Sequence, residues 1–141
     1  MAADRTAQPK AAPGSPPLLD DRRLQVSFPI RSGLLQRVTG YFHAVRDVSF
    51  QLAAVETLAL VGESGCGKTT TGKAIVQLLR RLATVQGQAL LAGQDLIQQQ
   101  SAALLEARRQ VQIIFQDPFA SLNPRLRLGE LLQEGLAVLQ P

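Results

Sequence analysis

The stretch that most constrains the fold is LALVGESGCGKTTTGKAIVQLL, which runs from Leu58 to Leu79. A short apolar run meets a glycine-rich loop, and a second apolar segment follows. The first run is continuous, as in a strand buried on both faces. After the loop, Ala74, Ile75 and Leu78 recur at helical spacing. The stretch therefore predicts a strand, a loop and a helix in succession, the unit from which α/β proteins are built.

The loop itself fits the phosphate-binding pattern G-x-x-x-x-G-K-[ST]. Glycines leave the backbone amides free to form an anion-binding nest, and the helix N-terminus adds unpaired N–H groups and the positive end of its dipole. Lys68 supplies an ammonium group for the β- and γ-phosphates, and the Thr69 hydroxyl is a hard ligand suited to Mg²⁺. The alternative is an ordinary glycine-rich turn. The predicted phosphate-binding residues are Gly62, Glu63, Ser64, Gly65, Cys66, Gly67, Lys68 and Thr69.

Composition excludes several other classes of site. Cys66 is the only cysteine and His43 the only histidine, so an internal disulfide, a zinc site and a serine–histidine pair are not expected. A reactive Cys66 is weighed against a small residue that fills a loop position, which is the favoured interpretation. The 15 basic residues are spread among 11 acidic ones, which argues against a nucleic-acid surface.

No apolar run approaches the roughly 18 residues of a membrane span, and the N-terminus lacks the apolar centre of a signal peptide. A cytoplasmic protein is therefore expected, with at most a peripheral membrane role. Residues 1–17 are rich in alanine and proline and predict a disordered tail. Leu24, Val26 and Phe28 alternate with polar residues, as do Val48, Phe50 and Leu52. Further elements are expected as a connection at 31–43, a helix at 69–82, a strand at 87–96, a helix at 101–110 capped by Ser101, a strand at 111–115, a loop at 116–127 and a helix at 128–139.

Two segments resemble a known protein family. AVRDVSFQL followed by ETLALVGESGCGKTT resembles the ATP-binding subunits of ABC transporters, and VQIIFQDPFASLNPR resembles the oligopeptide and dipeptide import branch. The resemblance covers roughly residues 24–139. It implies an α/β P-loop NTPase of the ABC ATPase type, with an antiparallel β-subdomain. The expected organisation is a nucleotide-binding core at 18–115, followed by the Q-loop and the start of the helical subdomain at 116–141.

The resemblance also implies roles for single residues. Gln116 matches the Q-loop glutamine that contacts the metal or the attacking water, so it and Lys68 are the expected catalytic residues. Thr69 matches the Mg²⁺ ligand, and Thr70 extends the nucleotide loop. Tyr41 is favoured to stack on the adenine of ATP, with Phe42 as the alternative. The sequence departs from the family at a turn before the loop, where Val55 stands in place of a common glycine.

Partners and competence follow from the same resemblance. It implies transmembrane permease subunits and a second ATPase subunit in a head-to-tail dimer at the cytoplasmic face of the inner membrane. Hydrolysis in the family also needs an SGGQ signature, a strand that ends in Asp-Glu and a late histidine, none of which occurs here. We therefore expect a truncated copy whose central strands lack neighbours. The alternatives are a nucleotide- or permease-binding fragment without ATPase activity, and an unrelated small kinase that leaves SLNPR unexplained.

Overall fold

The computed structural model describes residues 16–34, 36–117 and 122–139, so most of the predicted tail at 1–17 lies outside the described residues. The chain divides into two compact units, residues 1–99 and residues 100–141. The phosphate-loop stretch belongs to the first unit, and Gln116 belongs to the second. The boundary predicted at residue 116 between the core and the Q-loop region stays a prediction.

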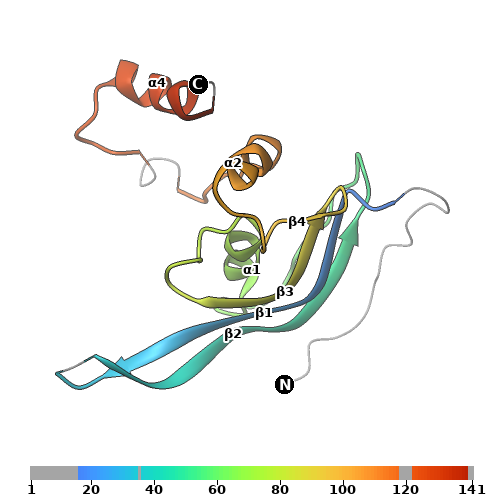
Figure 1. The fold of residues 1–141 in the computed structure, drawn as a ribbon, viewed down its shortest axis with the longest axis vertical. Coiled ribbons are helices and arrows are strands. Elements are labelled where there is room, and N and C mark those ends of the chain that lie inside the picture. Colours follow the sequence, from blue (N-terminus) through green and yellow to red (C-terminus); the bar gives the residue numbers. More distant parts are fainter. Residues whose placement is uncertain (1–15, 35, 118–121, 140–141) are drawn as a thin grey trace. The chain divides into compact units, whose positions relative to one another are not determined.

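The first unit is built on an antiparallel sheet (Figure 1). β1 (Leu19–Ser32) lies between β2 (Arg37–Leu52) and β3 (Thr84–Leu91), and β4 (Gln94–Asp95) pairs with β3 at the edge. The sheet confirms the expected antiparallel β-subdomain and the alternating strands around Leu24 and Val48. Both strands of the first hairpin are longer than predicted, because most of the expected connection at 31–43 pairs as strand.

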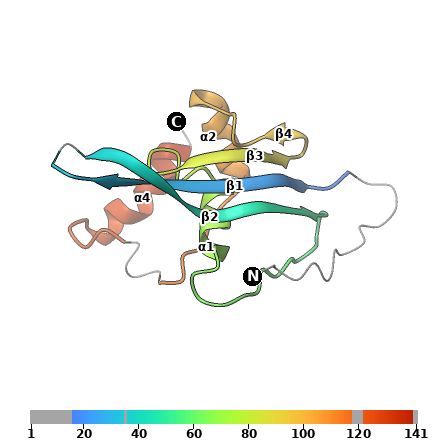
Figure 2. The same cartoon turned by 90° about the horizontal axis from the view of Figure 1, so that it is seen from below.

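One helix packs against this sheet. α1 (Lys68–Ile75) contacts β1 and β2, as the view from below also shows (Figure 2). The buried apolar side chains of the first unit come from the strands, from α1 and from the turns that follow α1 and β4: Leu24, Val26, Val45, Ala74, Ile75, Leu79, Ala89 and Leu96. Burying such side chains together is the main stabilising contribution in a unit of this kind. The core therefore lies between α1 and the sheet.

α1 ends earlier than its apolar pattern predicts. The amide of Leu78 donates to the carbonyl of Lys73 at 2.9 Å, and the amide of Gln77 donates to the carbonyl of Ala74 at 3.0 Å. Gln77 has a positive φ of 56°. This pair of bonds around a left-handed residue is the Schellman ending of a helix. The apolar residues beyond Ile75 consequently lie in turns, not in the predicted helix through Leu82.

The segment expected as one strand at 87–96 is a tight hairpin. β3 and β4 are joined by Ala92 and Gly93, which have φ values of 47° and 84°. Two positive φ values at the turn match a type I′ hairpin, whose twist suits antiparallel strands. The carboxylate of Asp95 then accepts a hydrogen bond from the amide of Ile97 at 3.0 Å, which fixes the chain as it leaves the sheet.

Two predicted strands do not form. Residues 58–61 and 111–115 have no strand assignment, and Val61 is 88% exposed while Ile114 is 94% exposed. A strand of this apolar kind is stable only between neighbours that satisfy its backbone and cover its faces. Within the described residues no strand pairs with either segment, so the sequence pattern is not realised there.

The second unit contains the two helices expected from the sequence. α2 spans Ser101–Gln110 and α4 spans Leu128–Leu139. The predicted cap differs, because Gln100 is the N-cap of α2 and makes no side-chain capping bond. Ser101 is instead the first helical residue. None of the described helices combines the length and apolarity needed to cross a bilayer.

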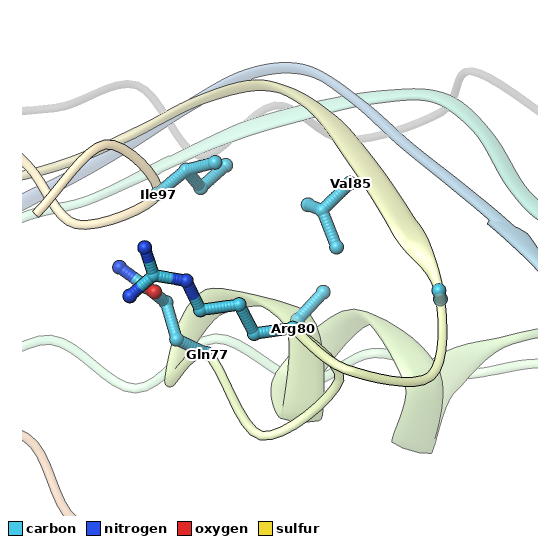
Figure 3. A pocket seen from close by; sticks show the side chains of 6 residues that line it. Gln77, Arg80, Val85 and Ile97 are labelled. Carbon is cyan, nitrogen blue, oxygen red and sulfur yellow. The ribbon is translucent and has the colours of Figure 1, made fainter. Parts of the chain in front are cut away.

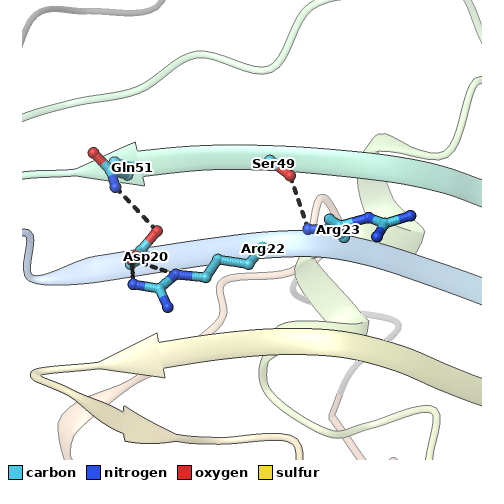
Figure 4. Close-up of polar contacts among 5 residues, drawn as sticks. All are labelled: Asp20, Arg22, Arg23, Ser49 and Gln51. Carbon is cyan, nitrogen blue, oxygen red and sulfur yellow. Dashed lines mark hydrogen bonds and ion pairs between the residues drawn. The ribbon is translucent and has the colours of Figure 1, made fainter.

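Polar side chains also stabilise the sheet. Figure 4 shows Asp20 on β1 accepting hydrogen bonds from Arg22 at 2.8 Å and from Gln51 on β2 at 3.2 Å. The backbone amide of Arg23 donates to the Ser49 hydroxyl at 2.8 Å. This bond lies where the register of β1 against β2 shifts. A side chain thus satisfies an amide in the stretch where regular pairing is interrupted.

Candidate nucleotide-binding site

The phosphate loop lies between the unpaired segment at 58–61 and the N-terminus of α1. Gly65 and Gly67 have φ values of 82° and 99°, in the left-handed region that favours glycine. A Cβ on Gly67 would lie 2.5 Å from the carbonyl oxygen of Ala44 on β2. A Cβ on Gly62 would lie 2.7 Å from the Cys66 sulfur. The glycines are therefore required by backbone conformation at Gly65 and Gly67 and by close packing at Gly62 and Gly67.

Lys68 turns back into the loop. Its ammonium nitrogen donates to the carbonyl oxygens of Gly62 at 2.8 Å and of Glu63 at 2.7 Å. The Cys66 sulfur lies 3.4 Å from the same nitrogen. A phosphate ligand would compete with these two carbonyls for the ammonium, and it would offer a full negative charge in place of a dipole. Lys68 is thus positioned to exchange a contact within the loop for a contact with an anion.

The threonines after the lysine differ in their environments. The Thr71 hydroxyl donates to the Gly67 carbonyl at 3.0 Å and is buried, so it secures the start of α1. Thr70 is half-buried. Thr69 is exposed, and within the described residues its hydroxyl makes no hydrogen bond. The Thr69 oxygen is therefore available as a hard ligand at the first turn of the helix.

The residues present fit a magnesium-bound nucleotide. Glu63, Ser64, Gly65 and Cys66 are exposed, and a Cβ on Gly65 would meet no atom within 4 Å, so the loop is open on that side. The N-terminal amides of α1 and the positive end of its dipole favour an anion at this place. Among the described residues, no group of three His, Cys, Asp or Glu side chains gathers. Within the first unit, the ligands for a metal at this loop would accordingly be the Thr69 hydroxyl and the phosphates themselves, and the contribution expected from Gln116 stays a prediction.

The two aromatic candidates for adenine lie on β2, and both are more than half exposed. Val26 pairs with Val45, Ser27 pairs with His43 and Phe28 pairs with Phe42, so Ala44 is an extra residue in β2. Because successive pairs alternate between faces, Phe42 shares a face with Val45, whose side chain lies near Gly67. Tyr41 shares the opposite face with His43. The register thus places Phe42, and not Tyr41, on the face of β2 that lies near Gly67, while the choice of adenine contact stays a prediction.

Gln116 lies in the irregular segment after α2, in the second unit, and its side chain is exposed. Residues 118–121, which include part of the FQDPFASLNPR segment, lie outside the described residues. Just beyond them, the Asn123 side-chain oxygen accepts a hydrogen bond from the Arg125 amide at 3.1 Å. The described parts of the predicted loop, residues 116–117 and 122–127, contain neither helix nor strand. The roles of Gln116 in catalysis and metal binding stay predictions.

A separate pocket of about 180 Å³ lies between the end of α1 and the sheet. Figure 3 shows Gln77 and Arg80 on one side of it and Val85 and Ile97 on the other. The Arg80 guanidinium donates to the carbonyl of Gln99 at 3.4 Å. None of the residues that line the pocket belongs to the phosphate loop. The pocket is therefore distinct from the candidate nucleotide site.

Sequence reasoning missed the close approach of the loop to β2. The Ala44 carbonyl and the Val45 side chain both lie beside Gly67. Neither residue belongs to a recognisable motif. Their positions depend on a bulge that no sequence pattern predicts. A second missed feature is Asp21, a buried carboxyl on β1 whose two oxygens have no hydrogen-bond partner within the described residues.

Comparison with known proteins decides the family. The profile described as ABC transporter matches residues 45–137, which include the phosphate loop, Gln116 and most of α4. The chain belongs to the ABC transporter family. The antiparallel sheet, the helix after the phosphate loop and the α/β fold class are those expected for an ABC ATPase domain. The resemblance to the ATP-binding subunits of ABC transporters is confirmed.

Several curated relatives are similar over most of this chain. It is 49% identical to the glutathione import ATP-binding protein GsiA of Pectobacterium atrosepticum, over 96% of this chain and 21% of the relative. It is 48% identical to the uncharacterized ABC transporter ATP-binding protein YejF of Escherichia coli, over 88% of this chain and 23% of the relative. The GsiA protein of Escherichia coli is 49% identical over 86% of this chain and 19% of its own length. The chain thus spans about a fifth of the length of these relatives.

Proposed function

We propose that this chain carries the ATP site of an ATP-binding subunit in an ABC importer for oligopeptides or dipeptides. The observation that carries the proposal is the phosphate loop itself, with left-handed glycines at Gly65 and Gly67 and with Lys68 at the start of α1. Membership of the ABC transporter family supports ATP as the nucleotide. The peptide branch rests on the FQDPFASLNPR segment. The name of a relative, glutathione import ATP-binding protein, mentions a short peptide as solute and supports the same class.

Each residue has a defined part in this proposal. The loop amides and Lys68 bind the phosphates, and Thr69 and Gln116 hold Mg²⁺, which when bound neutralises charge on the β- and γ-phosphates. Phe42 or Tyr41 stacks on the adenine. In the full subunit we infer partnership with transmembrane permease subunits and a second ATPase subunit, with the assembly peripheral to the inner membrane at its cytoplasmic face. Nucleic acid has no part in this function.

The chain's own residues support binding more strongly than turnover. The sequence contains no SGGQ segment, no apolar run that ends in Asp-Glu and no histidine after the loop. Phosphoryl transfer depends on charge stabilisation and positioning by several groups acting together, and a P-loop lysine alone supplies only part of it. We therefore propose that these 141 residues by themselves bind MgATP without hydrolysing it above background.

Calorimetric titration of the chain with MgATP tests the proposal. We expect saturable binding that Lys68→Ala weakens at least tenfold, because a charged contact to phosphate is worth roughly 1.5–3 kcal/mol. Lys73→Ala, a change of the same kind one turn further along α1, is the control and should bind normally. Absence of binding, or equal affinities for the two variants, would contradict the proposal. Phosphate release abolished by Lys68→Ala would refute the absence of turnover while retaining the nucleotide site.

The adenine contact is tested with a pair of variants. Stacking of a base on an aromatic side chain is worth about 1–3 kcal/mol, so losing the right one weakens MgATP binding by about fivefold or more. We expect this loss for Phe42→Ala and a smaller one for Tyr41→Ala. Magnesium tripolyphosphate, which lacks the base, should bind both variants alike. A larger loss for Tyr41→Ala would restore the candidate favoured by the sequence.

A further inference from the structure

The end of the β1–β2 hairpin extends beyond the rest of the sheet (Figure 1). The last pairing of β1 with β3 joins Ser27 to Thr84, while β1 and β2 continue to pair as far as Ser32 and Arg37. A ribbon with two strands and no third strand or helix against it is only marginally stable in water. The outer part of this projection, residues 30–34 and 36–40, is called the hairpin tip below.

Apolar side chains are exposed on both faces of the hairpin tip. Ile30 lies opposite Gly40, Arg31 lies opposite Val38 and Ser32 lies opposite Arg37. Because successive pairs face opposite sides, Ile30 and Arg37 share one face while Arg31 and Val38 share the other. Ile30 is 50% exposed and Val38 is 46% exposed. Leu34, in the turn at the end of the ribbon, is fully exposed.

The charges of the hairpin tip are of one sign. No aspartate or glutamate occurs between Asp21 and Asp47, whereas five arginines do. Arg22 and Arg23 form ion pairs with Asp20 and Asp47, while in the described part of the chain Arg31 and Arg37 form none. Each face of the hairpin tip therefore carries one apolar side chain, Ile30 or Val38, and one guanidinium group that has no carboxylate partner among the described residues. Such a surface is complementary to an anionic partner that also accommodates apolar groups.

We propose that the hairpin tip inserts end-on into the headgroup layer of an anionic lipid membrane. A flat protein surface would cover one face of the ribbon, whereas a lipid interface surrounds both faces. The lipid interface therefore matches the apolar and cationic side chains that both faces carry. Leu34, Ile30 and Val38 enter the apolar boundary, and the long side chains of Arg31 and Arg37 reach back to the lipid phosphates. The inference does not depend on nucleotide binding by the phosphate loop.

Sedimentation with lipid vesicles tests the charge requirement. The full chain should bind vesicles of phosphatidylcholine mixed with the anionic lipid phosphatidylglycerol, which gives the surface a negative potential, and not vesicles of phosphatidylcholine alone. The double variant Arg31→Gln/Arg37→Gln should bind the anionic vesicles about 25-fold more weakly, which corresponds to ~1 kcal/mol for each arginine. The double variant Arg125→Gln/Arg127→Gln loses the same charge from exposed positions in the second unit and should bind like the unmodified chain.

A fluorescent probe tests the geometry. The chain contains no tryptophan, so a single introduced indole reports its own surroundings. Emission from the Leu34→Trp variant should shift to shorter wavelength with anionic vesicles and be quenched by lipids with brominated acyl chains. Emission from Leu82→Trp, at an exposed position after α1, should not change. Circular dichroism checks that each variant keeps the fold of the parent chain.

Three results would overturn the proposal: equal binding to neutral and anionic vesicles, a double hairpin variant that binds like the parent, or Leu34→Trp emission that vesicles leave unchanged. Binding to a DNA or RNA oligonucleotide without binding to vesicles would also overturn it, in favour of a nucleic-acid partner. Loss of MgATP binding alone would leave this proposal standing, since the two surfaces are tested by different probes.

Discussion

Val55 adopts a backbone conformation that disfavours a β-branched residue. Its φ is 62°, and it is the third residue of a turn in which the Glu56 amide donates to the Ala53 carbonyl at 3.4 Å. Positive φ at this place in a turn strongly favours glycine. The side chain is fully exposed, so it gains little packing in return. Valine in place of glycine at this position is thus a local defect with a known physical cause.

Replacing Val55 by glycine should therefore stabilise the chain. We expect the free energy of unfolding to rise by about 1 kcal/mol, the usual cost of a left-handed conformation for a residue with a Cβ. Urea denaturation followed by circular dichroism measures the change. Val61→Gly is the control, because Val61 is also exposed but has no positive φ. It should be neutral or destabilising, and equal gains from both variants would argue against strain at Val55.

Asp21 is a second residue in an unfavourable environment. It is fully buried, and its carboxylate oxygens have no hydrogen-bond partner within the described residues. Burial, together with the neighbouring Asp20 carboxylate, raises the pKa of Asp21 from 3.8 to about 7. Desolvation disfavours the charged form of a carboxyl group, so the folded chain holds this proton more tightly than the unfolded chain does. This residue therefore links stability to pH.

The sign of this linkage is definite. Between pH 4 and pH 7 the unfolded chain has released a proton that the folded chain keeps, so the contribution of Asp21 to stability falls as pH rises and levels off above pH 7. The loss is of the order of a few kcal/mol, at about 1.4 kcal/mol for each pKa unit. The Asp21→Asn variant should lose this slope in urea denaturation across the range. Asp47→Asn, at an exposed position, should keep it, and a slope that survives Asp21→Asn would exclude Asp21 as its source.

At the scale of elements, the irregular positions decide where strands and helices end. Gly87 in β3 has a φ of 100°, and a Cβ there would lie 2.6 Å from the carbonyl oxygen of Arg23. The register of β1 against β3 shifts at this same place, between Arg22 and Gln25. Glycine at this position thus allows β1 and β3 to cross at the bulge with their backbones close together.

Gly87→Ala should disrupt this crossing. We expect a loss of roughly 2–4 kcal/mol in the free energy of unfolding, since a backbone atom, not a flexible side chain, must move. The matched control is Gly72→Ala in α1, where a Cβ meets nothing within 4 Å. That change should be neutral or stabilising by up to about 1 kcal/mol through helix propensity. Thermal denaturation of the two variants side by side distinguishes them, and a tolerated Gly87→Ala would contradict the close approach.

The helices and strands that the sequence predicts correctly are those that depend on local sequence pattern. Alternation located β1 and β2, and helix-forming residues located α2 and α4. The end of α1 was missed because Gln77 takes a left-handed ending usually occupied by glycine. Residues 58–61 were predicted as a strand because their hydrophobicity is that of a buried strand, yet strand pairing depends on neighbours that local pattern does not contain. The sequence predicts one strand at 87–96 in place of the hairpin at Ala92 and Gly93, because alanine does not indicate a turn with positive φ.

For the candidate site, the motif fixed the loop residues and the helix that follows them. The support from β2 was not predictable, because Ala44 is brought to Gly67 by a bulge and not by sequence proximity. The same bulge sets which face of β2 carries Phe42 and which carries Tyr41, and the choice between them stays a prediction. Gln116 is predicted from its motif alone, and its role stays a prediction.

At the scale of the whole molecule, the phosphate loop lies in the first unit and Gln116 in the second. The central proposal is that the loop at 62–69 binds MgATP. Cys66 offers a direct test, because it is the only cysteine in the chain, it is exposed and it lies inside the loop. A bound nucleotide should cover it.

The measurement is the rate at which iodoacetamide alkylates Cys66, followed by mass spectrometry with and without MgATP. The account predicts that saturating MgATP slows alkylation at least tenfold, a protection of the size expected when a ligand at about ten times its dissociation constant occupies the site. Lys68→Ala should lose that protection, and Lys73→Ala should keep it. Equal alkylation rates with and without MgATP in the unmodified chain would contradict the nucleotide site.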